Sequence, residues 1–167
     1  MSKLLVALSL VAFGFAAKAN ATEGSTLYVI KSININAPAA KTWEKIAKFG
    51  DLGVWHPAFA KTEILSGKDF KVGAKRELTL QDGGKIHETL IAYSAKNKTM
   101  SYKITESGLP LNDYVSTLEV HSNGADKSVV VWESSFNAKA PADDKAALDL
   151  IDGVYDGGLG NLKKILE

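Results

Sequence analysis

An arginine and a glutamate flank a predicted hairpin turn in this chain. Arg76 and Glu88 lie on either side of "QDGGK", at even positions shared with Leu78, Leu80, Ile86 and Leu90. Alternation along two paired strands predicts that both charged side chains point to the apolar side of a sheet. A charge buried there needs its partner. Either Glu88 is an acid or base and Arg76 an anion anchor inside a ligand cavity, or the two form a structural ion pair.

A histidine follows the tryptophan in "GVWHPAFAK", residues 53–61. His56 is a candidate acid or base, but no polar partner within hydrogen-bond reach is visible in the sequence. The other two histidines show no metal-ligand spacing, and without cysteine no haem can be attached through CxxCH. We therefore expect no metal and no cofactor. We expect Trp55 and Pro57 to pack a short helix against the sheet, with His56 at a cavity rim or in solvent, where replacement by alanine leaves folding nearly intact.

Large apolar and aromatic side chains from several elements could face the same space. Strand alternation allows the aromatic residues to point towards a long helix, where they either line a pocket for an apolar small molecule or fill a core. Sequence alone does not separate these two alternatives. The predicted ligand-binding residues are Trp55, Leu78, Leu90, Tyr102, Tyr114, Trp132, Phe136 and Tyr155.

The loop "ESGLPLNDY" carries apolar residues where polar ones are usual. Loops that present such residues often serve binding. Leu109, Pro110 and Leu111 therefore either cover the mouth of a cavity or contact a partner protein. The third alternative is a loop tucked onto the core.

The elements that must position these residues can be read from periodicity. "STLYVIKSININA" predicts a strand over 25–36, Pro38 begins a helix over about 38–48, and "DLGVWHP" predicts a short second helix. Six antiparallel strands follow between residues 58 and 138, separated by turn-forming clusters that include Asp82-Gly83 and Asn123-Gly124.

The chain closes with a predicted amphipathic helix that starts near Pro141. Its four glycines, at 153, 157, 158 and 160, each cost up to about 1 kcal/mol relative to alanine, so something should compensate. A seven-stranded antiparallel sheet around this helix buries both apolar faces. We therefore predict an α+β architecture over residues 22–167.

The first 21 residues have the pattern of a secretory signal peptide. Lys3 precedes an apolar run from Leu4 to Ala17, and small residues allow cleavage after Ala19 or Ala21. Removal of this segment with its two lysines changes the formal net charge from +1 to −1, which makes nucleic acid an improbable partner. We expect a periplasmic protein with no membrane span in its mature form.

Both the element order and several segments resemble the helix-grip superfamily of START-like, polyketide-cyclase-like and birch-pollen-allergen-like (Bet v 1-like) proteins. These segments are "TWEKIAKFGDLGVWHP", "LTLQDGGKIHETL" and "GLGNLKKILE". The resemblance, also called SRPBCC, implies a helix-grip fold with two short helices after the first strand. It leaves the activity open, because the fold hosts lipid carriers, cyclases, hydrolases and ligand binders.

A narrower resemblance rests on the signal peptide with "WHP", "ESGLPLNDY" and "VVVWESSF". This combination is most similar to the periplasmic MxaD proteins of methanol oxidation. The resemblance implies a non-enzymatic accessory protein that assists electron transfer from methanol dehydrogenase to cytochrome c. Two alternatives stay open: a cyclase or hydrolase that uses Glu88 or His56 with Arg76, and a carrier for a lipid or quinone.

Overall fold

The computed structural model of the protein describes residues 26–167. The predicted signal peptide, residues 1–21, lies outside the described residues. In chain order the elements are β1 (Leu27–Ile35), α1 (Ala39–Ile46), the 3-10 turn η1 (Phe49–Asp51), α2 (Leu52–Trp55), β2 (Phe59–Ser66), β3 (Lys75–Leu80), β4 (Lys85–Ser94), β5 (Thr99–Ser107), β6 (Leu111–Ser122), β7 (Ser128–Ala138) and α3 (Asp144–Leu166).

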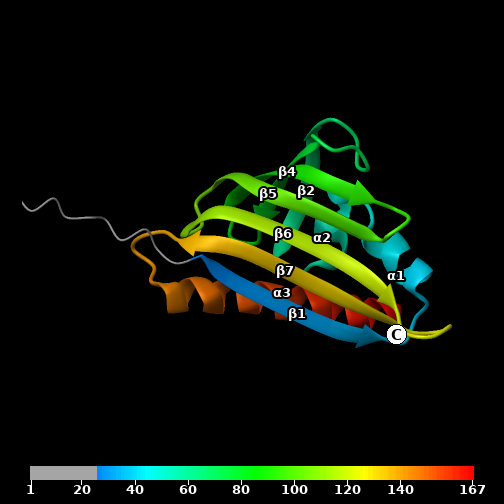
Figure 1. Cartoon of the computed structure of the whole chain (residues 1–167). Coiled ribbons are helices and arrows are strands. Elements are labelled where there is room, and N and C mark those ends of the chain that lie inside the picture. The colour runs from blue at the N-terminus through cyan, green and yellow to red at the C-terminus, as the bar shows by residue number, and fades with distance from the viewer. Residues whose placement is uncertain (1–25) are drawn as a thin grey trace, which may run out of the picture.

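One antiparallel sheet holds all seven strands, in the order β1-β7-β6-β5-β4-β3-β2. The sheet curves, and α3 runs along one of its faces as a second layer (Figure 1). The predicted α+β helix-grip fold is therefore confirmed, including the two short helices after the first strand. Within residues 26–167, no helix combines the length and the apolar character that crossing a membrane requires.

Turn chemistry sets the register of the strands that matter for the site. Gly83 and Gly124 have φ angles of +88° and +86°, the left-handed conformation expected at the two predicted hairpin turns. In the resulting β3–β4 ladder, Arg76 lies directly opposite Glu88. Both side chains are buried, as alternation predicts.

The two longer helices begin where local chemistry allows it. Asp143 caps α3 by accepting a hydrogen bond from the Ala146 amide at 2.8 Å, and α3 has two lysines in its last turn, which suits the helix dipole. Pro38 precedes α1, and its carbonyl accepts from the Thr42 amide at 3.0 Å. From these starting points α3 runs along one face of the sheet, and α1 lies at one end of it (Figure 1).

The sheet is not continuous between β5 and β6. Their ladder ends at the pair Lys103 and Val115, so residues 104–107 of β5 and 111–114 of β6 do not pair with each other. Both strands still pair with their other neighbours, β4 and β7, through irregular registers. The loop 108–110 closes the far side, which leaves a bounded gap in the sheet that we call the β5–β6 opening. Asp113, at its edge, has a φ of +54°, a conformation that occurs mostly at turns and functional sites.

Candidate ligand-binding site

A cavity of about 330 Å³ lies between the sheet and α3. Its volume falls at the lower end of the range of small-molecule pockets. Its walls are mainly aliphatic and aromatic, with contributions from α2, α3 and strands of the sheet. The lining residues are Leu52, Ala58, Phe59, Leu78, Leu80, Asp82, Ile86, Glu88, Ile104, Leu109, Tyr114, Trp132, Leu150, Ile151 and Val154.

The predicted ligand-binding residues divide into three groups. Leu78, Tyr114 and Trp132 line the cavity. Trp55 and Tyr102 instead line a separate hollow of about 10 Å³, too small for more than a water molecule. The remaining three, Leu90, Phe136 and Tyr155, are buried in the core without lining the cavity.

Hydrogen-bonded aromatic residues fill part of the space between the sheet and α3. Tyr155 stacks on Trp132 with ring centroids 4.3 Å apart, and its hydroxyl lies 2.7 Å from that of Tyr114 and 2.9 Å from Oγ of Ser116. The indole Nε1 of Trp132 donates to the Tyr102 hydroxyl at 2.9 Å. Burial raises the pKa of Tyr155 to about 12. A ligand cannot displace this network without leaving buried polar groups unpaired.

Arg76 and Glu88 form a buried ion pair behind the cavity wall. The Nε and Nη2 atoms of Arg76 both lie 2.6 Å from Oε2 of Glu88, and Nη1 donates to the Phe49 carbonyl at 2.5 Å. The guanidinium carbon stands 4.1 Å from the Phe49 ring centroid and 4.8 Å from that of Tyr102. This double cation–π contact supports the predicted structural pair.

Glu88 nevertheless reaches the cavity, which keeps the functional interpretation open. It is one of two acidic residues in the lining, and Asp82 at the β3–β4 turn is the other. Burial raises the pKa of Glu88, and the facing charge of Arg76 offsets part of that rise. Arg76 itself does not line the cavity. A ligand can therefore contact the carboxylate, whereas the guanidinium is shielded.

The predicted position of His56, at a rim or in solvent, is wrong. Its side chain is 2% exposed, and its ring packs 4.8 Å from Phe59 and 5.6 Å from Trp132, measured between centroids. The Ala58 amide donates to Nδ1 at 3.1 Å, so the ring proton resides on Nε2, which donates to the Val154 carbonyl at 2.9 Å. The hydrogen-bond partner that the sequence did not reveal is a backbone carbonyl of α3.

The surroundings of His56 hold it neutral. Burial lowers the pKa of His56 from its ordinary 6.5 to about 4, and the charge of Arg76 acts in the same direction. Both ring nitrogens are engaged by backbone groups, and the ring is absent from the cavity lining. His56 therefore joins α2 to α3 and does not face a ligand.

The predicted binding loop lies between the cavity and the sheet surface. Leu109 is in the cavity wall, and Leu111 is buried, which leaves little of that side chain for a partner protein. The Pro110 carbonyl accepts from the Lys139 amide at 2.9 Å, which ties the loop to the end of β7. Of the alternatives, this placement favours a loop that covers the cavity.

Sequence reasoning missed several lining residues. Leu80 and Ile86 share the alternation of Leu78 and were available from the same pattern. Ile104 continues the alternation of Tyr102 on β5 and was equally available. Phe59 and the α3 residues Leu150, Ile151 and Val154 carried no such signal, because their contact with the cavity depends on how the helix lies across the sheet. Alternation fixes a face, but not which part of that face remains unfilled.

Comparisons with known proteins agree with this fold. Residues 28–167 match the model of the family described as polyketide cyclase / dehydrase and lipid transport. No curated protein sequence matches the chain. Among solved structures, the protein XoxI from Bacillus cereus is similar at 26% identity and a TM-score of 0.77, over 83% of this chain and 94% of that one.

Two more distant structures share the fold alone. A START superfamily protein from Mycobacterium smegmatis has 13% identity and a TM-score of 0.71, over 83% of this chain and 96% of that one. The Zhui aromatase/cyclase from Streptomyces sp. R1128 has 16% identity and a TM-score of 0.70, over 85% of this chain and 94% of that one. With the family match over residues 28–167, the chain belongs to the polyketide cyclase/dehydrase and lipid transport family.

Proposed function

We propose that the protein binds a small apolar molecule, without covalent chemistry, in the cavity between α3 and the sheet. The observation that carries the proposal is the cavity of about 330 Å³, whose wall is mainly aliphatic and aromatic. Beside this cavity, the space between the sheet and α3 is filled by hydrogen-bonded aromatic side chains, among them Tyr155 and Tyr102. Burial of an apolar ligand there gains about 25 cal/mol per Å² of surface removed from water.

The experiment is a calorimetric titration of the purified protein with 1-octanol. We expect saturable binding to the wild type and a loss of at least tenfold in affinity for Leu150→Trp, because Leu150 lines the cavity and a larger side chain occupies it. The matched control is Ile165→Trp, a change on the same helix at an exposed residue. Octanol binding that is equally strong in both variants would place the ligand elsewhere and refute the proposal.

The cellular role we propose is that of an exported accessory protein in methanol oxidation. Its support is the signal-peptide pattern of residues 1–21 and the MxaD-like segments "WHP", "ESGLPLNDY" and "VVVWESSF". The test measures electron transfer from methanol dehydrogenase to its cytochrome c with and without the purified protein. A rate that stays unchanged across a range of salt concentrations contradicts this role.

Two other functions use the same cavity. A cyclase or hydrolase is favoured by one observation, the carboxyl group of Glu88 in the cavity wall with its pKa raised by burial. His56, its other candidate group, has both ring nitrogens occupied, which supports binding over catalysis. A lipid or quinone carrier would retain its cargo during purification, and native mass spectrometry would detect the added mass.

A further inference from the structure

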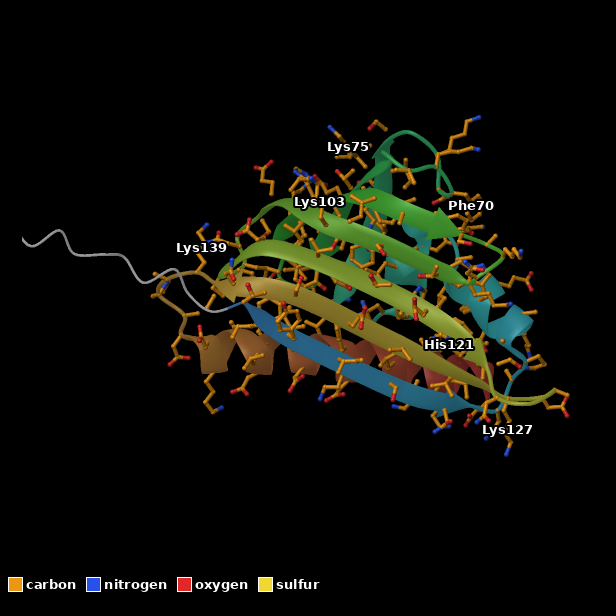
Figure 2. The ribbon with its side chains drawn as sticks, viewed as in Figure 1. Phe70, Lys75, Lys103, His121, Lys127 and Lys139 are labelled. Atoms are coloured by element: carbon orange, nitrogen blue, oxygen red, sulfur yellow. The ribbon has the colours of Figure 1, made fainter. Side chains whose placement is uncertain are left out.

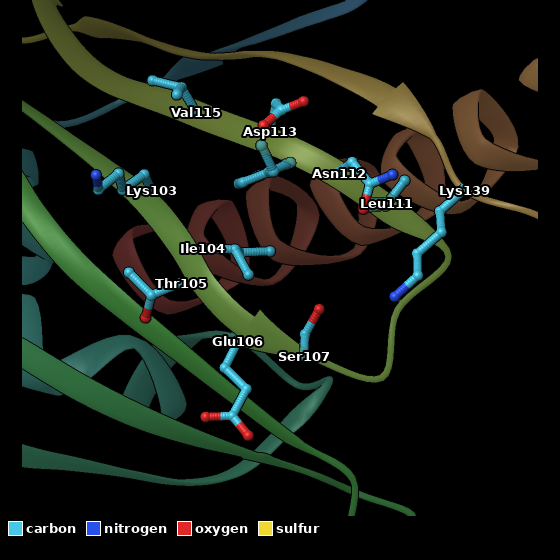
Figure 3. Close-up of a pocket in the computed structure, with 11 residues that line it drawn as sticks. Lys103, Ile104, Thr105, Glu106, Ser107, Leu111, Asn112, Asp113, Val115 and Lys139 are labelled. Carbon is cyan, nitrogen blue, oxygen red and sulfur yellow. The ribbon is translucent and has the colours of Figure 1, made fainter. Parts of the chain in front are cut away.

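A second hollow, of about 610 Å³, lies on the outer face of the sheet at the β5–β6 opening. Residues from both strand segments line it, together with Lys139 after β7. Figure 3 shows Lys103 and Lys139 on opposite sides of this hollow, with Ile104 between them and α3 behind the opening. The sheet carries no ladder hydrogen bonds between β5 and β6 here, because their pairing ends at Lys103 and Val115.

The outer hollow and the inner cavity are separated by two side chains. Ile104 and Tyr114 are the residues that line both. Tyr114 is fixed by the contact of its hydroxyl with Tyr155 at 2.7 Å. Ile104 is an aliphatic side chain that is only partly buried and has no hydrogen bond to lose. We therefore expect Ile104, and not Tyr114, to move when a ligand passes between the two spaces.

The acidic side chains at the opening have partners, whereas the two lysines do not. Glu106 lies 3.1 Å from Nδ1 of His87, and Asp113 accepts from Nδ2 of Asn137 at 3.1 Å. In contrast, the ammonium groups of Lys103 and Lys139 have no hydrogen-bond or ion-pair partner among residues 26–167. Two unpaired cations therefore flank the place where Ile104 and Tyr114 separate the outer hollow from the apolar cavity.

The cavity also reaches the β3–β4 turn, where its lining holds an acidic residue and no lysine or arginine. Asp82 is the charged residue of the lining at that turn, and its carboxylate accepts from the Gly84 amide at 2.9 Å. An anionic head group is disfavoured beside Asp82, where no cation lines the cavity. It is favoured at the opening, because Glu106 and Asp113 each have a partner there while the two lysines have none. An anionic ligand should therefore bind with its head group at the β5–β6 opening and its apolar part towards Asp82.

We propose that the β5–β6 opening seats the anionic head group of an amphiphile whose apolar part occupies the inner cavity. The ligand class is a carboxylate with one apolar chain or ring system, held by Lys103 and Lys139. This inference rests on the proposed binding function and specifies its ligand. Exposed ion pairs contribute modestly, so the two lysines together account for about a three- to tenfold preference.

The test compares three ligands of one chain length: octanoate, 1-octanol and octylammonium. We expect the wild type to bind octanoate more tightly than octylammonium, with an octanoate affinity that falls as salt is added, because salt screens exposed charges. In Lys103→Gln/Lys139→Gln, the ratio of octanoate to octanol affinity should fall about three- to tenfold while octanol binding stays unchanged. The matched control is Lys127→Gln, an exposed lysine at the other end of the sheet (Figure 2).

The octanol arm separates the two proposals. If octanol binds but the double variant keeps the wild-type ratio, or if Lys127→Gln lowers it equally, the head-group site is refuted and the cavity proposal stands. If octanol binds to no variant, the cavity proposal fails and this inference falls with it. As a test of the passage, Ile104→Ala should speed octanoate association in stopped-flow measurements, and an unchanged rate would contradict entry past Ile104.

Discussion

The imidazole ring of His56 lies directly against Gly158 of α3. A β-carbon built on this glycine would stand 2.3 Å from Cδ2 and 2.6 Å from Nε2 of His56, and 2.9 Å from the Trp132 ring. Nearby, Nδ2 of Asn161 donates to the Trp55 carbonyl at 2.8 Å. The absent side chain at position 158 therefore lets α2 and α3 approach each other, which is the compensation expected for that glycine.

Alanine at two neighbouring glycines should have opposite effects on stability. Gly158→Ala forces the rings of His56 and Trp132 to move, and overpacking of this kind costs about 1–3 kcal/mol. Gly157→Ala meets no atom within 4 Å, so it gains up to about 1 kcal/mol of helix propensity. Urea unfolding midpoints measure both. Equal shifts in the two variants would show that the helix does not contact His56 as described.

The contrast between these glycines shows how far the sequence could predict the fold. All four glycines interrupt the apolar stripe of the last helix in the same way, and only the packed structure distinguishes Gly158 from the others. His56 was misplaced for the same reason, because its partner Val154 is 98 residues away in the chain. The Arg76 and Glu88 pair was predictable, since a short turn fixes the register of both strands.

The site was only partly predictable, for a physical reason. Alternation assigned Leu78, Tyr114 and Trp132 to the concave face. A cavity, however, forms where side chains leave space unfilled, and that depends on the packing of all its walls together. The β5–β6 opening depends on two irregular registers at neighbouring strands. A hydrophobic pattern does not encode such splaying.

The free energy of unfolding should decrease as the pH is lowered, and His56 should cause part of that decrease. The pKa of His56 is about 4 in the folded protein and 6.5 when unfolded, so the unfolded state takes up the proton first as pH falls. The neutral ring stabilises the fold fully above pH 6.5, and this contribution is lost between pH 6.5 and 4, to a total of about 3 kcal/mol. We expect His56→Gln to flatten the profile of unfolding free energy over that window.

The control for this measurement is His121→Gln, which removes an exposed histidine on β6. Subtraction of the His56→Gln profile from that of the wild type isolates the contribution of one ring. Parallel profiles for the wild type and His56→Gln would mean that the ring titrates equally in both states, in conflict with its burial.

The Arg76 and Glu88 pair should show strong coupling in a double-mutant cycle. Glu88→Gln leaves a buried guanidinium without its counter-charge, a loss of about 3–5 kcal/mol. Arg76→Met leaves Glu88 with a raised pKa and no offsetting charge. This variant should keep its stability at acid pH, where Glu88 is protonated, and lose it as pH rises above about 4.5. The double variant should be less destabilised than the sum of the single ones. Additive losses would indicate that the two side chains do not interact.

Removal of one hydroxyl should test the aromatic network that fills the core beside the cavity. Tyr155→Phe leaves the buried Tyr114 hydroxyl without its partner at 2.7 Å, and an unsatisfied buried hydroxyl costs about 1–3 kcal/mol. Tyr28→Phe, at a tyrosine that is 71% exposed, is the control and should be neutral. Because Tyr114 also forms the partition to the β5–β6 opening, Tyr155→Phe should in addition speed octanoate association. A variant as stable as the control would show that this network adds nothing to the fold.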